Sequence, residues 1–251
     1  MKQAEFDGKG SCIRWTETPG EEPARVYVHG LGAMSAVYHA HIAARPELVG
    51  RRSLFVDLPG HGISDRPEHF GYTLQEHADA LAAALDAAGL TGVELVAHSM
   101  GGAVAIVLAH RRPDLVSRLV LTEANLDAFP PPTAGSSGIA AHEEDAFVDG
   151  AHARVLANVG PLWAATMRLA DPRALHRSAV GLRRGSEPVM RSILEQLPIE
   201  RVYLQGELSG ELAGRQTLEA AGVRVVTVAG AGHNVMFDNP DAFAAAVAGR
   251  C

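Results

Sequence analysis

Residues 93–110 read VELVAHSMGGAVAIVLAH, and this stretch decides the fold class. Its first four residues are the kind of short apolar run that forms a buried parallel strand. The residues that follow Ser99 are almost all small or apolar, which favours a helix packed on that strand. The stretch therefore predicts a strand, a sharp turn at Ser99 and a helix, which together form a repeating unit of an α/β sheet.

The turn itself, residues 97–101, has the pattern small-x-Ser-x-Gly, with Ala97 where a glycine is usual. Small residues two before and two after the serine leave room for a tight strand-to-helix turn. Such a turn exposes the Ser99 hydroxyl and aims the N-terminus of a helix at it, where negative charge is stabilised. A serine that merely begins a helix would give the same letters, so the neighbouring motifs must decide.

The bulk properties describe an ordinary globular protein. The chain has 251 residues, 47% of them hydrophobic and 20% charged, which suits one large α/β domain or two small ones. A net charge of −7 without a basic stripe argues against nucleic acid as a partner. Cys12 and Cys251 make no disulfide framework, and neither an apolar signal core nor a span-length apolar stretch is present. We therefore expect a cytoplasmic protein with no membrane partner.

No metal or cofactor is expected either. The 12 histidines are scattered, and none belongs to a His-Glu-x-x-His motif. The expected partner is a small-molecule substrate, and the sequence leaves open whether the protein is a monomer or a homodimer.

Strand-like and helix-like runs alternate along the chain, which predicts a mostly parallel sheet with helices on both faces. The strand-like runs are residues 25–28, 53–56, 93–96, 118–121, 201–204 and 224–228, and the helix-like runs are 35–44, 73–88, 100–112, 211–221 and 240–248. Residues 126–198 contain no clear strand, so we predict a helical cap there and a core domain made of residues 1–125 and 199–251. Ordinary helices covering the sheet would be the simpler interpretation of that segment.

Three further motifs follow predicted strands. Residues 29–32 (HGLG) could present the N–H of Leu31, which with the N–H of Met100 would form an oxyanion hole. His233, in the glycine-flanked loop after the last strand, could take the proton that makes Ser99 a nucleophile. Residues 57–64 (DLPGHGIS) are interpreted as a rigid turn, in which Asp57 and His61 hold backbone rather than catalyse.

Taken in order, these motifs resemble the α/β-hydrolase superfamily over nearly the whole chain. The resemblance rests on HG at 29–30, DLPGHG at 57–62, AHSMGG at 97–102 and GH at 232–233. It implies an α/β fold with an eight-stranded, mostly parallel sheet, a helical cap inserted after strand 6, Ser99 as nucleophile and His233 as base.

The acid of the triad departs from the common pattern, because Ser209 stands where the family usually has an aspartate. Glu123, at the end of the strand next to the nucleophile strand, is our choice. That placement resembles haloalkane dehalogenases and some lactone hydrolases. Glu207 is the second candidate and Asp127 the third.

A serine nucleophile favours acyl transfer, so the expected function is hydrolysis of an ester, lactone or thioester of a small, largely apolar substrate. The assigned substrate-binding residues are Gly30, His98, Phe129, Trp163 and Met167. The arginines of the insertion, among them Arg173 and Arg177, are expected mainly to form a solvated face.

Three other functions stay open at this point. A carbon–carbon bond hydrolase and an acyltransferase of this fold would use the same residues. A non-catalytic ligand receptor would keep the pocket, and even the triad, without turnover.

Overall fold

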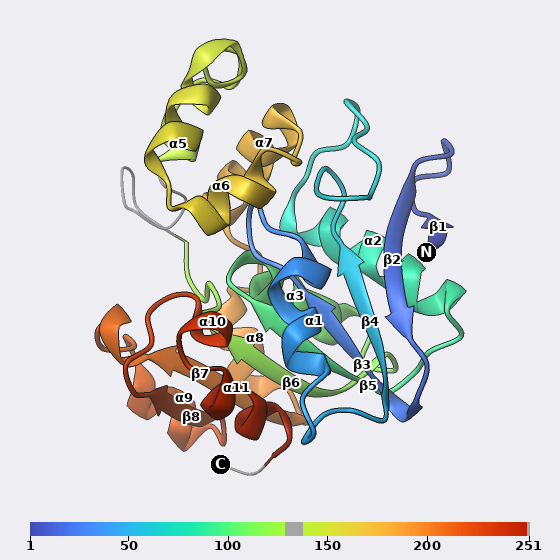
Figure 1. Cartoon of the computed structure of the whole chain (residues 1–251), viewed down its shortest axis with the longest axis vertical. Helices are drawn as coiled ribbons and strands as arrows, with labels where there is room; N and C mark the ends of the chain where they lie inside the picture. Colours follow the sequence, from blue (N-terminus) through green and yellow to red (C-terminus); the bar gives the residue numbers. More distant parts are fainter. Residues whose placement is uncertain (129–137, 250–251) are drawn as a thin grey trace.

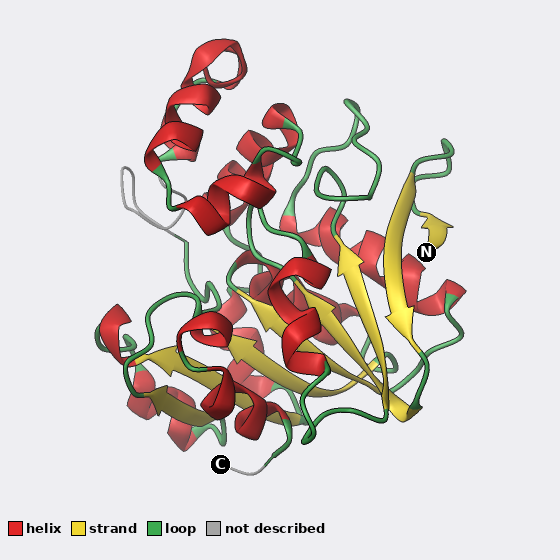
Figure 2. Ribbon diagram, in the orientation of Figure 1, coloured by secondary structure: helices red, strands yellow, loops and turns green. Residues whose placement is uncertain are grey.

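The computed structural model describes residues 1–128 and 138–249, and it is built around one twisted sheet with helices on both faces (Figures 1 and 2). The sheet has eight strands in the order β1-β2-β4-β3-β5-β6-β7-β8. The strands are β1 (Lys2–Glu5), β2 (Cys12–Thr18), β3 (Glu21–Val28), β4 (Arg51–Asp57), β5 (Val93–His98), β6 (Val116–Thr122), β7 (Glu200–Gly206) and β8 (Arg224–Val228). β2 runs antiparallel to both of its neighbours, and all other pairs are parallel. The expected mostly parallel, eight-stranded sheet is confirmed.

The two N-terminal strands have no counterpart among the runs predicted one by one from the sequence. In β2, Ile13 and Trp15 are buried while their neighbours are partly exposed, so the strand alternates with a period of two. Alternation of this kind marks an antiparallel strand with only one covered face. Continuous apolar runs mark strands that are buried on both faces, so β1 and β2 lack this signal.

Helices cover both faces of the sheet (Figure 1). The helical elements are α1 (Ser35–Ala43), α2 (Leu74–Ala87), α3 (Met100–Arg111), η2 (Ile139–Ala141), α4 (Glu144–Ala146), η3 (Phe147–Ala151), α5 (His152–Asn158), α6 (Pro161–Met167), α7 (Pro172–Arg184), α8 (Met190–Gln196), η4 (Glu207–Ser209), α9 (Arg215–Ala220), α10 (Val235–Asp238) and α11 (Pro240–Val247). On one face, α1, α10 and α11 bury a cluster that includes Tyr38, Met236 and Phe243. On the other, α2, α3 and α8 share a larger cluster. Among the helices of the described residues, none combines the length and apolarity needed to cross a bilayer.

Local signals explain why helix α2 begins and ends where it does. The Thr73 side chain accepts from the N–H of Glu76, and the Glu76 carboxylate accepts in turn from the N–H of Thr73. This reciprocal capping satisfies N–H groups that a helix start leaves open. Gly89, just past the helix end, has a φ of +67, which favours glycine.

Residues 126–198, which we call the insertion, lie between β6 and β7, and their described part is helical. Figure 1 shows α5, α6 and α7 standing beyond the end of the sheet. Helix α7 rests on the turn after β4, where the N–H of Asp171 donates to Gly60 O at 2.9 Å. The division into a core of residues 1–125 and 199–251 with a separate cap stays a prediction.

Two arginines of the insertion do not form the solvated face expected of them. Arg173 and Arg177 both bond to the carboxylate of Glu144, and Arg177 also donates to the carbonyls of Glu68 and Phe70. Their side chains therefore fasten helix α7 to helix α4 and to a loop of the sheet region.

Candidate active site

Ser99 sits on a strained strand-to-helix turn. Its φ of 52° and ψ of −120° lie in a region that side chains with a Cβ rarely adopt. The turn is held because the N–H of Ser99 donates to Thr122 O at 2.9 Å, while helix α3 begins at the next residue. A Cβ at Gly101 would lie 2.4 Å from His29 O, so only glycine fits there. The strand, sharp turn and helix predicted around Ser99 are all present.

Glu123 shares this backbone strain and lies on the neighbouring strand end. The described non-glycine residues with positive φ are Tyr72, Ser99 and Glu123, so two of the three belong to the candidate site. The N–H of Glu123 donates to Leu204 O at 3.0 Å, which fixes its backbone on β7. One carboxylate oxygen of Glu123 accepts from the N–H of Gly206 at 2.6 Å, and the other lies 3.6 Å from His233 Nδ1. With its side chain only 10% exposed, Glu123 is the carboxylate that the structure brings to His233.

The other two candidate acids have different partners. Glu207 lies in η4, and its carboxylate accepts from the N–H of Gly230 at 2.9 Å. Asp127 is half exposed and forms a forked pair with Arg191, at 2.6 Å for the shorter contact. Ser209, at the family's usual acid position, ends the same short helix as Glu207.

The loop that carries His233 is held from two sides. His98 Nε2 donates to His233 O at 2.9 Å, and the N–H of Gly232 donates to the carboxylate of Asp238 at 2.9 Å. His98 is 3% exposed, and burial together with the nearby His233 ring holds its pKa well below the ordinary value. His98, which the sequence predicts to bind substrate, is thus buried and bonded to the loop that carries His233, and its role toward the substrate stays a prediction. The last helix, α11, is capped by Asn239, whose side chain accepts from the N–H of Ala242.

The expected oxyanion turn follows β3. Gly30 O accepts from the N–H of Ala33 at 3.1 Å and from His29 Nδ1 at 2.7 Å, so the turn is anchored at its first carbonyl. His29 Nε2 accepts from the N–H of Leu58 at 2.9 Å, and burial lowers the pKa of this neutral ring to about 4. A Cβ added to Gly30 would lie 3.0 Å from the Ser99 Cβ, which places the turn against the serine.

Met100 is the first residue of α3, so its N–H belongs to the group that no helix satisfies internally. Leu31 and Met100 therefore lie on the two segments that meet at Ser99. This is the arrangement that a two-donor oxyanion hole requires.

Residues 57–64 form the rigid turn expected from the sequence. The carboxylate of Asp57 accepts from the N–H of Ser35 at 2.8 Å and from the N–H of Ile63 at 3.1 Å. Burial raises the pKa of Asp57 to about 6. His61 is fully buried, and burial lowers its pKa to about 3. Both side chains serve the turn.

The substrate-binding candidates of the insertion that the structure describes reach the backbone of the turn at residues 30–33 with their side chains. Trp163 Nε1 donates to Leu31 O at 2.7 Å. Met167 is fully buried and lies close to Gly32, where an added Cβ would come within 3.3 Å of its Cγ. Phe129 lies outside the described residues. No local sequence pattern indicates the indole contact, because it joins positions far apart in the chain.

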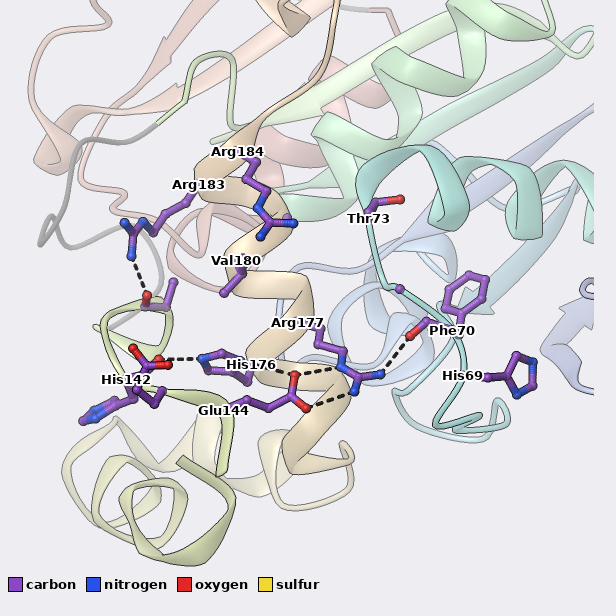
Figure 3. A pocket seen from close by; sticks show the side chains of 14 residues that line it. His69, Phe70, Thr73, His142, Glu144, His176, Arg177, Val180, Arg183 and Arg184 are labelled. Carbon is purple, nitrogen blue, oxygen red and sulfur yellow. Dashed lines mark hydrogen bonds and ion pairs between the residues drawn. The ribbon is translucent and has the colours of Figure 1, made fainter. Parts of the chain in front are cut away.

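A separate cavity of about 790 Å³ opens between helix α7, helix α4 and the loop before α2 (Figure 3). None of its described lining residues belongs to the candidate triad. Figure 3 shows the guanidinium of Arg177 facing the carboxylate of Glu144, and the two distances are 2.7 and 2.9 Å. Arg183 donates to the carbonyl of Ala140. Glu144, Arg177 and Arg183 in this cavity thus already have protein partners.

Within residues 1–128 and 138–249, no three His, Cys, Asp or Glu side chains gather as a metal site would need.

Comparisons with known proteins agree with this geometry. A family model described as alpha/beta hydrolase fold matches residues 25–174. An esterase of Mycobacterium tuberculosis is 33% identical over 71% of this chain and 55% of its own length. A 2-(acetamidomethylene)succinate hydrolase of Mesorhizobium japonicum is 27% identical over 88% of this chain and 85% of its own. Three uncharacterised mycobacterial relatives are matched over only 30% of their own length.

The solved structure of an enol-lactonase from Burkholderia xenovorans superposes with a TM-score of 0.79, at 20% identity and with 99% of each chain covered. At that identity the likeness speaks for the fold. Together with the family match, it places this chain in the α/β-hydrolase fold family.

Proposed function

We propose that this protein is a serine hydrolase that cleaves an ester, lactone or thioester bond of a small, largely apolar substrate. The observation that carries the proposal is the contact of 3.6 Å between Glu123 and His233 Nδ1, at the sheet edge where Ser99 stands on a strained turn. Backbone strain of this kind concentrates at functional sites. The relatives named esterase and hydrolase, and the structure titled enol-lactonase, support the same class of reaction.

In the proposed acylation step, Ser99 Oγ attacks the acyl carbon and His233 Nε2 takes the serine proton. The carbonyl oxygen becomes an oxyanion, which the N–H groups of Leu31 and Met100 stabilise. The intermediate then expels the alcohol or thiol, which receives the proton from His233, and an acyl-enzyme on Ser99 remains. Glu123 orients the imidazole and stabilises its charged form without being protonated.

In the second step, water attacks the acyl carbon while His233 takes a water proton. The tetrahedral intermediate then collapses, the bond between the acyl carbon and Ser99 Oγ breaks, and the carboxylic acid leaves. His233 returns its proton to Ser99 Oγ, which restores the free enzyme. With a lactone substrate, the leaving alkoxide and the acid belong to one product molecule. The same groups serve both steps, so no cofactor is needed.

The insertion would then serve as a cap over the carboxyl edge of the sheet and would shape the substrate pocket. Its helices α6 and α7 lie against the turns at residues 30–33 and 57–64. In this proposal its apolar side chains favour acyl chains or rings over charged substrates.

The experiment is hydrolysis of p-nitrophenyl esters from acetate to decanoate by the wild type and by Ser99→Ala. We expect turnover by the wild type, a chain-length preference set by the cap, and loss of turnover in the variant. Product analysis in the presence of an added alcohol separates hydrolysis from acyl transfer. A folded wild type that cleaves no ester or lactone, and that no fluorophosphonate labels, would instead favour a ligand receptor. Labelling without ester turnover would favour a carbon–carbon bond substrate.

A further inference from the structure

We propose that Trp163 is a positioning residue, which holds the oxyanion turn in its active orientation and thereby links the insertion to catalysis. This inference rests on the proposed function, and it assigns the indole N–H a role that does not involve touching the substrate.

Residues 30–33 form a type II β-turn. The N–H of Ala33 donates to Gly30 O at 3.1 Å, and Gly32, at the third position, has a φ of +68°. Leu31, at the second position, is not among the described residues with positive φ. This combination separates type II from the mirror-image turns, and it requires glycine at the third position. The peptide that joins Leu31 to Gly32 is rotated by roughly half a turn from its orientation in a type I turn.

Trp163 binds that central peptide. Its indole N–H donates to Leu31 O at 2.7 Å, so the carbonyl faces helix α6. A flip of the peptide toward type I would turn the carbonyl away and leave a partly buried N–H without its acceptor, which costs free energy. Trp163 therefore favours one of two accessible orientations of the turn.

Packing supports the hydrogen bond. A Cβ added to Gly32 would lie 2.8 Å from Trp163 Nε1, 3.3 Å from Met167 Cγ and 3.4 Å from Leu175 Cδ1. Helices α6 and α7 are thus seated directly on the turn. The close approach fits glycine alone, both for space and for the positive φ.

Leu31 carries both groups of interest, since its N–H is the proposed oxyanion donor and its carbonyl is the acceptor of Trp163. Fixing one end of the residue restrains the other. His29 and Ala33 hold the preceding carbonyl of Gly30, so the donor peptide is held on one side by the sheet region and on the other by the insertion. A shift of helix α6 would break only the hydrogen bond from Trp163 to Leu31 O and would leave the contacts of Gly30 O in place.

The test is the variant Trp163→Phe, which keeps an aromatic ring and removes the N–H. Trp15→Phe is the matched control, because Trp15 lies on β2 and donates to its neighbour Glu17 at 3.2 Å, far along the chain from the site. We measure kcat and KM on the preferred p-nitrophenyl ester, and the affinity for an alkyl boronic acid, which binds as a tetrahedral analogue.

We expect kcat of Trp163→Phe to fall about tenfold, less than the 10²–10³-fold loss that follows removal of an oxyanion donor itself. KM should change by less than about twofold, and boronate affinity should fall by about the same factor as kcat/KM. Gly32→Ala should reproduce this pattern by displacing the indole. Trp15→Phe should match the wild type in all three quantities.

A wild-type kcat in Trp163→Phe, or a raised KM with kcat unchanged and a shifted chain-length preference, would overturn the inference and make Trp163 a substrate contact. A wild type that neither turns over an ester nor binds the boronate would overturn the proposed function, and the inference with it. The two failures are therefore distinguishable.

Discussion

The carboxyl edge of the sheet and the insertion position their side chains by different means. At the sheet edge, backbone bonds do this: the N–H of Ser99 donates to Thr122 O, and the N–H of Glu123 donates to Leu204 O. In the insertion, side chains do it, through Arg177 on Glu144 and Trp163 on Leu31. A backbone frame can hold residues in strained conformations, whereas side-chain contacts can be broken and re-formed. In the proposed function, the first region carries out the chemistry and the second shapes the substrate pocket.

The largest expected effect comes from Ser99. Removing the nucleophile should lower kcat by on the order of 10³-fold or more. The same position also tests the backbone strain, since φ is +52°. Ser99→Gly should be more stable than Ser99→Ala by about 1 kcal/mol, because glycine adopts positive φ without a Cβ clash.

Urea unfolding of both variants measures this difference. A glycine variant no more stable than the alanine variant would mean that the sheet edge stores no strain at the serine. Activity near the wild-type level in either variant would contradict the nucleophile assignment.

Ionisable groups in the two regions should change the free energy of unfolding over different pH ranges. His29, His39 and His61 lie in the sheet region, and burial lowers their pKa values to about 4, 3 and 3 from 6.5. In the unfolded chain these rings take up protons below pH 6.5, and in the folded chain they do not, so stability falls as the pH drops below 6.5. Asp57 opposes this, because burial raises its pKa to about 6 and it gains a proton more readily when folded. These four groups together should lower the free energy of unfolding by on the order of 3 kcal/mol between pH 7 and pH 5.5. His77 and His98 add to this loss, because burial holds their pKa values well below 6.5.

The stability that Glu144 contributes in the insertion should change at lower pH. Bonds from Arg177 and Arg173 lower the pKa of Glu144 to about 2 from 4.5, so the stability that Glu144 contributes is lost only as the pH falls below 4.5. Chemical denaturation followed from pH 8 to pH 4 measures the first effect. A free energy of unfolding that is constant from pH 7 to pH 5.5 would contradict it.

The acid assignment predicts the next effect. Glu123→Gln should lower kcat by about 10²-fold or more, because an amide cannot stabilise the imidazolium of His233. Glu207→Gln is the matched control, since the Glu207 side chain accepts from Gly230 rather than from His233. Steady-state kinetics on one ester compare the two. The reverse ranking would move the acid to Glu207, near the usual family position.

The smallest effect is expected in the insertion. Glu144→Gln should destabilise the protein by about 1 kcal/mol, because it weakens a partly exposed charge network. Asp145→Asn, whose side chain is 84% exposed, is the control and should have almost no effect. For a domain of this size the shift in Tm should be about 2–4 °C for Glu144→Gln. Equal Tm values for both variants would show that Glu144 does not fasten the insertion.

The sequence was sufficient for the fold, and it named the residues of the proposed site, because those features depend on local patterns. The strand before Ser99 and the helix after it follow from the apolar run and the small residues, and Glu123 follows from its place at the end of the adjacent strand. Even the departure at Ser209 was visible as a missing carboxylate. Each of these inferences needs only the order of elements along the chain.

What sequence reasoning missed depends on contacts between distant segments. The indole of Trp163 on Leu31, the imidazole of His98 on the His233 carbonyl and the guanidinium of Arg177 on Glu144 have no local signature. The alternating strand β2 was missed for a different reason, since its single buried face gives no continuous apolar run. Side-chain contacts of the first kind require the fold before they can be named.

The most direct test of the central claim is to trap the acyl-enzyme analogue and locate it. The wild type is treated with a fluorophosphonate, and intact-mass and peptide mass spectrometry then identify the modified residue. With Ser99, His233 and Glu123 as the triad, we expect one adduct, on Ser99. It should form much more slowly in Glu123→Gln and at the wild-type rate in Glu207→Gln. An adduct on another residue would show that Ser99 is not the nucleophile. The absence of any adduct on a folded protein that turns over esters would show the same.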